Sequence, residues 1–379
     1  MTFLRKPSAG ATRDFLSAHA VRTGERAFVA GREAATRETK AVEGRSRCAP
    51  DKMAFGCAVP FPLSRRCIMV RGVTRCAIAG VLFVVGLLGL SAADDKAIPG
   101  VGPAGEIKKA HTGFKFTEGP IGAAAGSVYF SDIPNEKLHK IDADGKLGVF
   151  REKSNVSNGL MINAKGEVVA CEMSGAIAAI SADGKERRVI TDKFDGKRYN
   201  APNDLVLDAA GGVYFTDPAF RAPTPLPQGK TCVYYVDAKR TVTRIIDDLP
   251  NPNGVRLSPD EKTLYVFPTG QKQMLSYPVE GPGKIGKGKT FCELKQAKEG
   301  GNAGGDGGTV DSKGNVYVAA GTGLQVFDKD GKYLGTIVFP EQPSNATFGG
   351  KDMKTLYVTA RTSVYACPMD VAGHRYPAK

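Results

Sequence analysis

The chain has 379 residues, 42% of them hydrophobic, and a formal net charge of +13. This length is sufficient for two average domains or for one large closed domain with an extensive core. Residues 1–93 contain 15 basic and 6 acidic side chains, against 37 and 33 in the remainder, so the positive charge belongs mainly to the N-terminal part. The composition therefore argues against nucleic-acid binding, and 46 glycines without any tryptophan favour tight turns over long helices.

A basic segment beginning at Met69 leads into an apolar run from Cys76 to Leu90, which ends at Ser91-Ala92-Ala93. This order is typical of a secretory signal peptide, so we predict a signal peptide at residues 69–93 with cleavage after Ala93. The run is shorter than the roughly 20 apolar residues that usually span a bilayer. We therefore expect an exported protein, periplasmic or secreted, without stable membrane association after cleavage. An uncleaved membrane anchor is the alternative.

Residues 1–68 precede this predicted signal peptide, although signal peptides normally begin at the start of a chain. They are rich in Arg, Ala and Gly and have no sustained apolar period. We interpret them either as a wrongly assigned upstream extension or as a disordered segment. Residues 94–104 are expected to form a linker, and residues 105–379 a single domain.

Four of the eight cysteines lie in the leader, and the other four are widely spaced: Cys171, Cys232, Cys292 and Cys367. No CxxC spacing occurs among them, which excludes a compact zinc ribbon. We expect them to be small buried residues in strands, although an exported location would permit disulfides.

From about residue 105 onward the sequence repeats a unit made of a polar loop residue, a first strand, a tight turn and a second strand. The clearest unit has Asn203 ahead of residues 205–207, a Gly-rich turn and then Val213-Tyr-Phe-Thr-Asp217. In all six units the second strand starts 10 or 11 residues after the polar residue, and successive second strands are 40 to 52 residues apart. A period of this length with about four strands is typical of a β-propeller blade.

Asp-Gly turns mark the later strands of several units, because this dipeptide favours a tight hairpin. The sixth unit supplies three strands and ends near Cys367. We expect the segment 107–116 to supply its fourth strand and to close the ring. The sequence therefore predicts an all-β fold, a six-bladed propeller with four-stranded blades. Two stacked β-sandwiches are the alternative, which the constant offset disfavours.

The polar residue of each unit precedes or begins the innermost strand of its blade, so equivalent residues should converge at one mouth of the central channel. These residues are Glu118, Asn158, Asn203, Asn253, Asp306 and Asn345. Two carboxylates and several amide oxygens form a donor set for one hard divalent cation, with Ca²⁺ expected and Mg²⁺ or Mn²⁺ possible. Zn²⁺ is less natural because no histidine falls on the ring, although carboxylates do bind it. The alternative is that each side chain satisfies local backbone groups, as in Asx-turns.

The second strand of a unit returns to the same mouth, and in the first three units it ends on an acidic residue: Asp132, Glu172 and Asp217. These carboxylates are expected to orient the ring residues or to bind substrate hydroxyls; exposed loop-end acids are the alternative. The Pro-rich insertion 218–230 belongs to the same rim, where it would either cover the mouth and supply Arg221 or serve as a stiff loop.

Five ordered motifs in residues 105–367 resemble the gluconolactonase, or senescence-marker-protein-30, family of six-bladed propellers. They are Thr117-Glu118-Gly119-Pro120, Asn158-Gly159-Leu160, Ala201-Pro202-Asn203-Asp204, Pro252-Asn253-Gly254 and Gly305-Asp306-Gly307. The resemblance implies that Glu118, Asn253 and Asp306 bind one divalent metal. It also implies that Asn203 contacts the metal or the substrate, and that Asp306 is the general base.

Two positions depart from the family pattern. Ile121-Gly122 stand where an aromatic residue usually follows Glu-Gly-Pro, and Ala201 stands where some members carry a substrate-binding arginine. These departures concern the substrate more than the metal. No Gly-x-Ser-x-Gly elbow and no phosphate-binding loop is present in the sequence.

The resulting hypothesis is a metal-dependent hydrolase that opens a small sugar lactone, with Asp306 as base or as the group that positions the water. The metal-binding candidates are Glu118, Asn203, Asn253 and Asp306, and the substrate-binding candidates are Asn158, Asn203, Glu172, Asp217 and Asn345. An exported, non-catalytic ligand-binding propeller and a hydrolase of another ester or phosphoester are the alternatives. No pattern in the sequence predicts an oligomeric state.

Overall fold

A computed structural model describes residues 97–297 and 303–376 of the chain. The predicted N-terminal extension 1–68, the predicted signal peptide 69–93 and the first residues of the predicted linker lie outside the described residues. Among the residues that are described, no helix is both long enough and apolar enough to cross a membrane.

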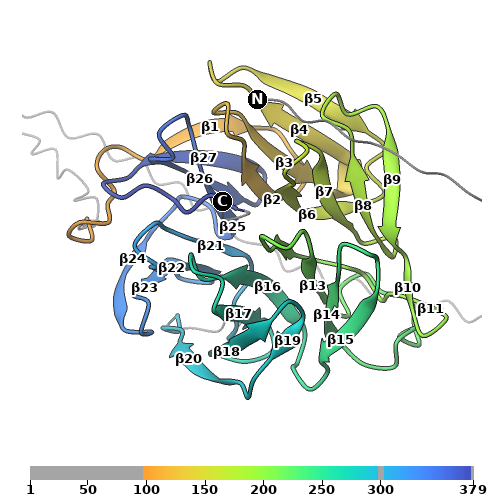
Figure 1. Ribbon diagram of the computed structural model, residues 1–379. Helices are drawn as coiled ribbons and strands as arrows, with labels where there is room; N and C mark the ends of the chain where they lie inside the picture. Colours follow the sequence, from red (N-terminus) through yellow and green to blue (C-terminus); the bar gives the residue numbers. More distant parts are fainter. Residues whose placement is uncertain (1–96, 298–302, 377–379) are drawn as a thin grey trace, which may run out of the picture. The chain divides into compact units, whose positions relative to one another are not determined.

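Six antiparallel sheets surround a common centre, as Figure 1 shows, which confirms the predicted six-bladed β-propeller. Blade 1 contains β2 (Thr117–Gly122), β3 (Val128–Asp132), β4 (Lys137–Ile141) and β5 (Leu147–Glu152). Blade 2 contains β6 (Ser157–Ile162), β7 (Val168–Glu172), β8 (Ala176–Ile180) and β9 (Arg187–Thr191). Blade 3 contains β12 (Leu205–Leu207), β13 (Val213–Asp217), β14 (Cys232–Val236) and β15 (Val242–Ile246).

The other three blades repeat this pattern with small additions. Blade 4 contains β16 (Pro252–Leu257), β17 (Thr263–Pro268), β18 (Gln273–Gly281) and β20 (Lys289–Glu293), and a short β19 (Lys284–Ile285) also pairs with β18. Blade 5 contains β21 (Gly308–Val310), β22 (Val316–Ala320), β23 (Gly323–Phe327) and β24 (Tyr333–Ile337). Blade 6 contains β25 (Pro343–Gly349), β26 (Thr355–Ala360), β27 (Ser363–Pro368) and β1 (Lys108–Thr112). Outside the blades lie the hairpin β10 (Lys193–Phe194) and β11 (Lys197–Arg198), and a 3₁₀ turn η1 (Ile133–Asn135).

The first and last parts of the described chain meet in blade 6, where β1 pairs antiparallel with β27. This pairing confirms that an N-terminal strand closes the ring. Glu341 secures the junction, because it forms an ion pair with Lys109 on β1 at 3.1 Å and accepts a hydrogen bond from Ser363 on β27. Burial opposes ionisation of Glu341, but the bonds from Ser363 and Lys109 outweigh it and lower the pKa of this carboxyl to about 2.

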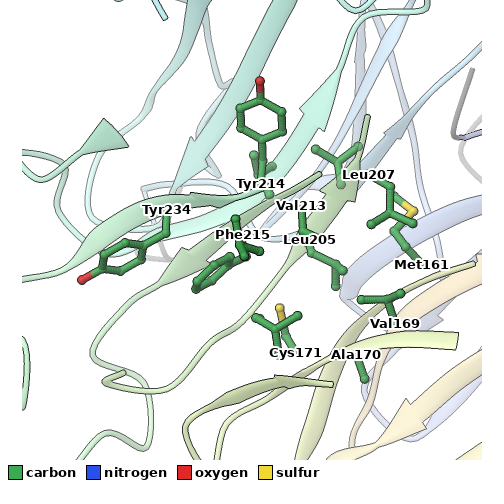
Figure 2. Packing of buried hydrophobic residues seen from close by; sticks show 14 of the residues in the cluster. Met161, Val169, Ala170, Cys171, Leu205, Leu207, Val213, Tyr214, Phe215 and Tyr234 are labelled. Atoms are coloured by element: carbon green, nitrogen blue, oxygen red, sulfur yellow. The ribbon is translucent and has the colours of Figure 1, made fainter. Parts of the chain in front are cut away.

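The second strands β3, β7, β13 and β22 are buried along their whole length. Neighbouring blades cover them, as the contacts of β3 with β6 and of β13 with β16 show. Tyr214 and Phe215 point to opposite faces of β13 in Figure 2. Phe215 and Leu205 of blade 3 belong to the same buried cluster as Cys171 of blade 2. Burial of each such large side chain stabilises the fold by about 1.5–3 kcal/mol. The four cysteines of the described residues are buried and unpaired, as their spacing suggested.

Two terminal segments also pack on the propeller. Ile98 and Val101, within the predicted linker, are buried in the same cluster as Met369 and Tyr365. At the other end, Tyr376 donates a hydrogen bond to the carbonyl of Leu257, the last residue of β16. The C-terminal segment therefore covers the ends of the inner strands that lie away from the predicted ring.

Candidate metal centre and active-site cleft

The repeat places the six ring residues at equivalent positions, on or just before the innermost strand of each blade. Glu118, Asn158, Asn253 and Asn345 lie on β2, β6, β16 and β25, whereas Asn203 and Asp306 lie two residues before the first residues of β12 and β21. In the four blades where the residue lies on the strand, the register of the first two strands is broken at or beside it. Such β-bulges redirect a side chain away from the regular ladder, and they are frequent at active sites.

Hydrogen bonds between neighbouring blades hold the ring together. Ser131 and Thr216 donate their hydroxyls to the carbonyls of Asn158 and Asn253, at 2.7 and 2.6 Å. Gly119 has a positive φ of 52°, and a Cβ there would lie 1.9 Å from the Asn158 carbonyl oxygen. Only glycine allows this approach of the two backbones. The glycine of the Glu-Gly-Pro motif thus allows blades 1 and 2 to approach closely enough to bring their ring residues together.

Five of the six ring residues line one open cleft with a volume of about 470 Å³: Glu118, Asn158, Asn203, Asn253 and Asp306. Asn345 does not line it; this side chain lies beneath, where its Nδ2 donates to Glu118 Oε2 at 3.1 Å. The structure therefore brings all four metal-binding candidates and two of the five substrate-binding candidates to the cleft wall. Asn345 is placed as a partner of Glu118.

Glu118 and Asp306 form a pair of carboxylates at the base of this cleft. Burial raises the pKa of Glu118 well above its ordinary value, and the charge of Asp306 raises it further. Burial likewise raises the pKa of Asp306 to about 7. A hydrogen bond that Asn253 Nδ2 donates to Asp306 Oδ1 at 2.8 Å acts in the opposite direction and lowers this pKa. Within the described ranges neither carboxylate forms an ion pair. Two buried acids without a counter-charge fit a cation.

The amide oxygens of the cleft fit the same interpretation. Asn158 Oδ1 is buried and accepts no hydrogen bond from the described part of the protein. A buried acceptor without a donor costs about 1–3 kcal/mol, and either a cation or a hydroxyl of a bound ligand would satisfy it. Residues 97–297 and 303–376 contain no cluster of three or more His, Cys, Asp or Glu side chains that could hold a metal. Any cation held in this cleft would therefore be coordinated by the two carboxylates together with amide oxygens, a donor set that suits a hard ion rather than Zn²⁺.

The acidic residues at the ends of the second strands are buried and do not line the cleft. Asp132 accepts hydrogen bonds from the backbone of Lys115 and Phe116, and Asp217 from the backbone of Asn200 and Ala201. Both carboxylates thus hold the backbone two to three residues ahead of a ring residue. Their position suits the orienting role, one of the three possibilities that the sequence left open.

Glu172 is completely buried, in an ion pair with Arg187 and with a hydrogen bond from Asn155 at 3.2 Å. Its carboxylate holds the loop ahead of β6. Direct contact of Glu172 or Asp217 with a substrate would require these buried bonds to break.

Apolar side chains form the wall of the cleft, and the sequence analysis did not identify them. Ile133, Met173 and Ala201 are buried together, with Phe116 and Phe220 packed against them. Ile133 and Met173 each directly follow the acidic residue that ends a second strand, Asp132 and Glu172. This shared position in the repeat could have predicted that both lie at the cleft. Ala201, where some family members carry arginine, is fully buried behind this wall and does not line the cleft.

Two exposed cations complete the rim: Lys115 and Arg221. Arg221 comes from the Pro-rich insertion 218–230. The insertion reaches the cleft, as expected if it covers the mouth and supplies Arg221. Neither cation forms an ion pair with another described residue.

The profile of the SMP-30/gluconolactonase/LRE-like region matches residues 116–362, which contain all six ring residues. The chain belongs to the SMP-30/gluconolactonase family. The five motifs named above follow one another within the matched region and lie around the cleft.

Curated relatives and solved structures agree with this assignment. The chain is 32% identical over 285 residues to the gluconolactonase of Zymomonas mobilis, a match that covers 66% of this chain and 77% of that protein. It is 27% identical over 253 residues to the pentonolactonase of Haloferax volcanii, covering 65% and 82%. The solved gluconolactonase of Xanthomonas campestris superimposes with a TM-score of 0.64 at 29% identity, covering 70% of this chain and 89% of that one.

Proposed function

We propose that the protein is a metal-dependent lactonase that hydrolyses a sugar lactone to the open-chain hydroxy acid. The observation that carries this proposal is the pair Glu118 and Asp306, two buried carboxylates without a counter-cation at the base of an open cleft. Relatives that act on gluconolactone and pentonolactone support the lactone as the class of substrate. Ca²⁺ is the proposed ion, because every candidate ligand is an oxygen.

The cation would be held by Glu118 and Asp306 together with Asn253 and Asn203. When bound, it supplies a Lewis acid that polarises the lactone carbonyl and stabilises the negative charge that develops on its oxygen. A carboxylate donor set of this kind also attracts a cation into the cleft before any substrate binds.

Asp306 accepts a hydrogen bond from the attacking water and takes its proton as the water oxygen bonds to the carbonyl carbon. The ring C–O bond then breaks, and the proton passes to the departing alkoxide, which becomes the hydroxyl of the product. Asn253 keeps Asp306 in position, because its Nδ2 donates to Asp306 Oδ1 at 2.8 Å and to Thr269 Oγ1 at 3.0 Å. Asn158 and Asn203 present amide groups to the cleft, where they bind the hydroxyls of the sugar ring.

The test is hydrolysis of a panel of sugar lactones and aryl esters, followed with a pH indicator, after chelator treatment and again with added Ca²⁺. We expect lactone opening that chelation abolishes and Ca²⁺ restores. The Asp306→Asn variant should lose at least about 100-fold in turnover, the contribution of a general base, whereas the exposed control Asp330→Asn should keep wild-type turnover. Full activity of Asp306→Asn, or activity that survives chelation, would contradict the mechanism. Hydrolysis of aryl esters alone would make the protein a different ester hydrolase.

We further propose that the protein is exported. The support is the sequence pattern of residues 69–93, a basic segment, an apolar run and a small-residue exit. Sequencing the N-terminus of the protein from the extracytoplasmic fraction tests this, with Asp94 expected as the first residue. A mature form that retains residues before Met69 would refute both the cleavage and the start assigned to Met69.

A further inference from the structure

A buried arginine lies directly beneath the cleft and joins four blades. Arg256 on β16 is 3% exposed and forms an ion pair with Asp204 Oδ2 at 2.9 Å. Its Nε donates to the carbonyl of Gly308 at 2.6 Å, its Nη1 to that of Leu205 at 3.2 Å, and its Nη2 to Asn345 Oδ1 at 3.3 Å. None of the sequence motifs includes this residue, and the proposed mechanism does not use it.

The bond to Asn345 determines which way the Asn345 amide faces. Its oxygen accepts two hydrogen bonds, from Arg256 Nη2 and from the backbone N–H of Ala346 at 2.8 Å. With the oxygen held by two donors, the NH₂ group is left to face Glu118, and it donates to Glu118 Oε2 at 3.1 Å. A flipped amide would bring an NH₂ group against two donors and an oxygen against a carboxylate.

The same contacts determine which oxygen of Glu118 is free. Oε2 accepts from Asn345 and also from the backbone N–H of Gly119 at 2.6 Å. Among the described residues the only other group that bonds to Glu118 is the carboxyl of Asp306, so Oε1 is not held by an amide or a hydroxyl and can serve a cation bound between the two acids.

We propose that Arg256 and Asn345 are positioning residues that act in series on the metal centre. Arg256 orients the amide of Asn345, and Asn345 holds Glu118 so that one carboxylate oxygen is presented to the cation. This inference rests on the proposed function, because the cation is part of that proposal. Residues that hold a metal ligand in place in this way typically contribute 10- to 100-fold to metal affinity.

Arginine suits this role better than lysine would. Its planar fork donates from three nitrogens in fixed directions, and here those directions reach Asp204, Gly308 and Asn345 at once. A lysine at 256 keeps the positive charge next to Asp204 but cannot make all three bonds. The variant Arg256→Lys therefore separates orientation from charge.

The experiment measures Ca²⁺ binding by isothermal titration calorimetry, at one pH, to chelator-treated full-length protein. The variants are Arg256→Lys, Asn345→Ala and the double variant. The control Tyr235→Phe removes a buried hydrogen bond to Asp208 at 2.9 Å, and neither of these two residues lines the cleft. A thermal unfolding curve of each protein shows that it is folded and how much stability it has lost.

We expect each single variant to raise the Kd for Ca²⁺ about 10- to 100-fold. The double variant should be no weaker than the worse single one, because two residues that act in series show non-additive effects. Tyr235→Phe should lose stability with an unchanged Kd. If Arg256→Lys does not fold, Asn345→Ala alone still tests whether Asn345 positions Glu118 for the cation.

Three results would overturn the inference: variants less stable than wild type but with the wild-type Kd, effects that multiply fully in the double variant, or a Kd that Asn345→Ala leaves unchanged. Each of these leaves the proposed function intact, because the wild-type protein still binds Ca²⁺ and opens lactones. If the wild-type protein itself binds no Ca²⁺, the metal-dependent function fails first and this inference fails with it.

Discussion

The two carboxylates at the base of the cleft destabilise the metal-free protein, and their effect can be measured. Burial raises the pKa of Asp306 from 3.8 to about 7. The proton on Asp306 therefore stabilises the folded state, and this stabilisation is lost as the pH rises from about 4 through 7. A shift of this size corresponds to about 4 kcal/mol at pH 8, as an upper limit, because Glu118 shares the repulsion. Asp306→Asn removes the charge and keeps the shape.

We expect metal-free Asp306→Asn to be more stable than the wild type at pH 8, by up to about 4 kcal/mol, with a smaller advantage at pH 5. Urea unfolding in chelator at the two pH values measures this difference, with the exposed control Asp330→Asn measured alongside. Added Ca²⁺ should reduce the advantage of Asp306→Asn, since a ligand at 100 times its Kd stabilises the wild type by about 2.7 kcal/mol. The reasoning is refuted if metal-free Asp306→Asn is less stable than the wild type at pH 8, or if its advantage is equal at both pH values.

Three further changes give distinct outcomes. Glu341→Gln should lower the urea midpoint at pH 7, and the difference from wild type should disappear as the pH falls from about 4.5 toward 2, where Glu341 takes up its proton. Gly307→Ala would place a Cβ 2.0 Å from Asn345 Cγ, so we expect a loss of about 1–3 kcal/mol in urea unfolding; Gly148→Ala, with open space around it, should cost far less. Arg221→Gln should raise KM about 2- to 5-fold for a lactone that carries a carboxylate, the effect of one exposed ion pair, and should leave KM for a neutral lactone unchanged.

The fold was predictable because the repeat is strict in the part of each blade that is buried. The distance from ring residue to second strand is 10 or 11 residues in every unit, since each first hairpin must fit between two neighbouring blades. In the clearest unit, the predicted start of the second strand at Val213 is the first residue of β13. The additions that the sequence analysis missed, β19 and the hairpin β10–β11, lie outside this repeated part, where no neighbouring blade constrains the length.

The members of the site could be predicted from the sequence, but their partners could not. Glu118, Asn253 and Asp306 each lie at the same distance in sequence before the second strand of their blade, so they occupy equivalent positions around the cleft. The bond between Glu118 and Asn345 joins residues 227 positions apart, and only the closed ring brings them together. The burial of Glu172 and Asp217 was equally hidden, because the same strand-end position is compatible with an exposed or an engaged carboxylate. Arg256 was missed because a charged residue within a strand gives no signal of its target.

Blade 6 is assembled from the earliest and the latest residues of the propeller, since β1 joins β25, β26 and β27. While a ribosome is still making the last of these strands, β1 has no partner and the circle of sheets stays open. Asn345 of blade 6 holds Glu118 of blade 1 beneath the cleft. The cleft therefore takes its final form only when the last strands of the propeller have joined the first.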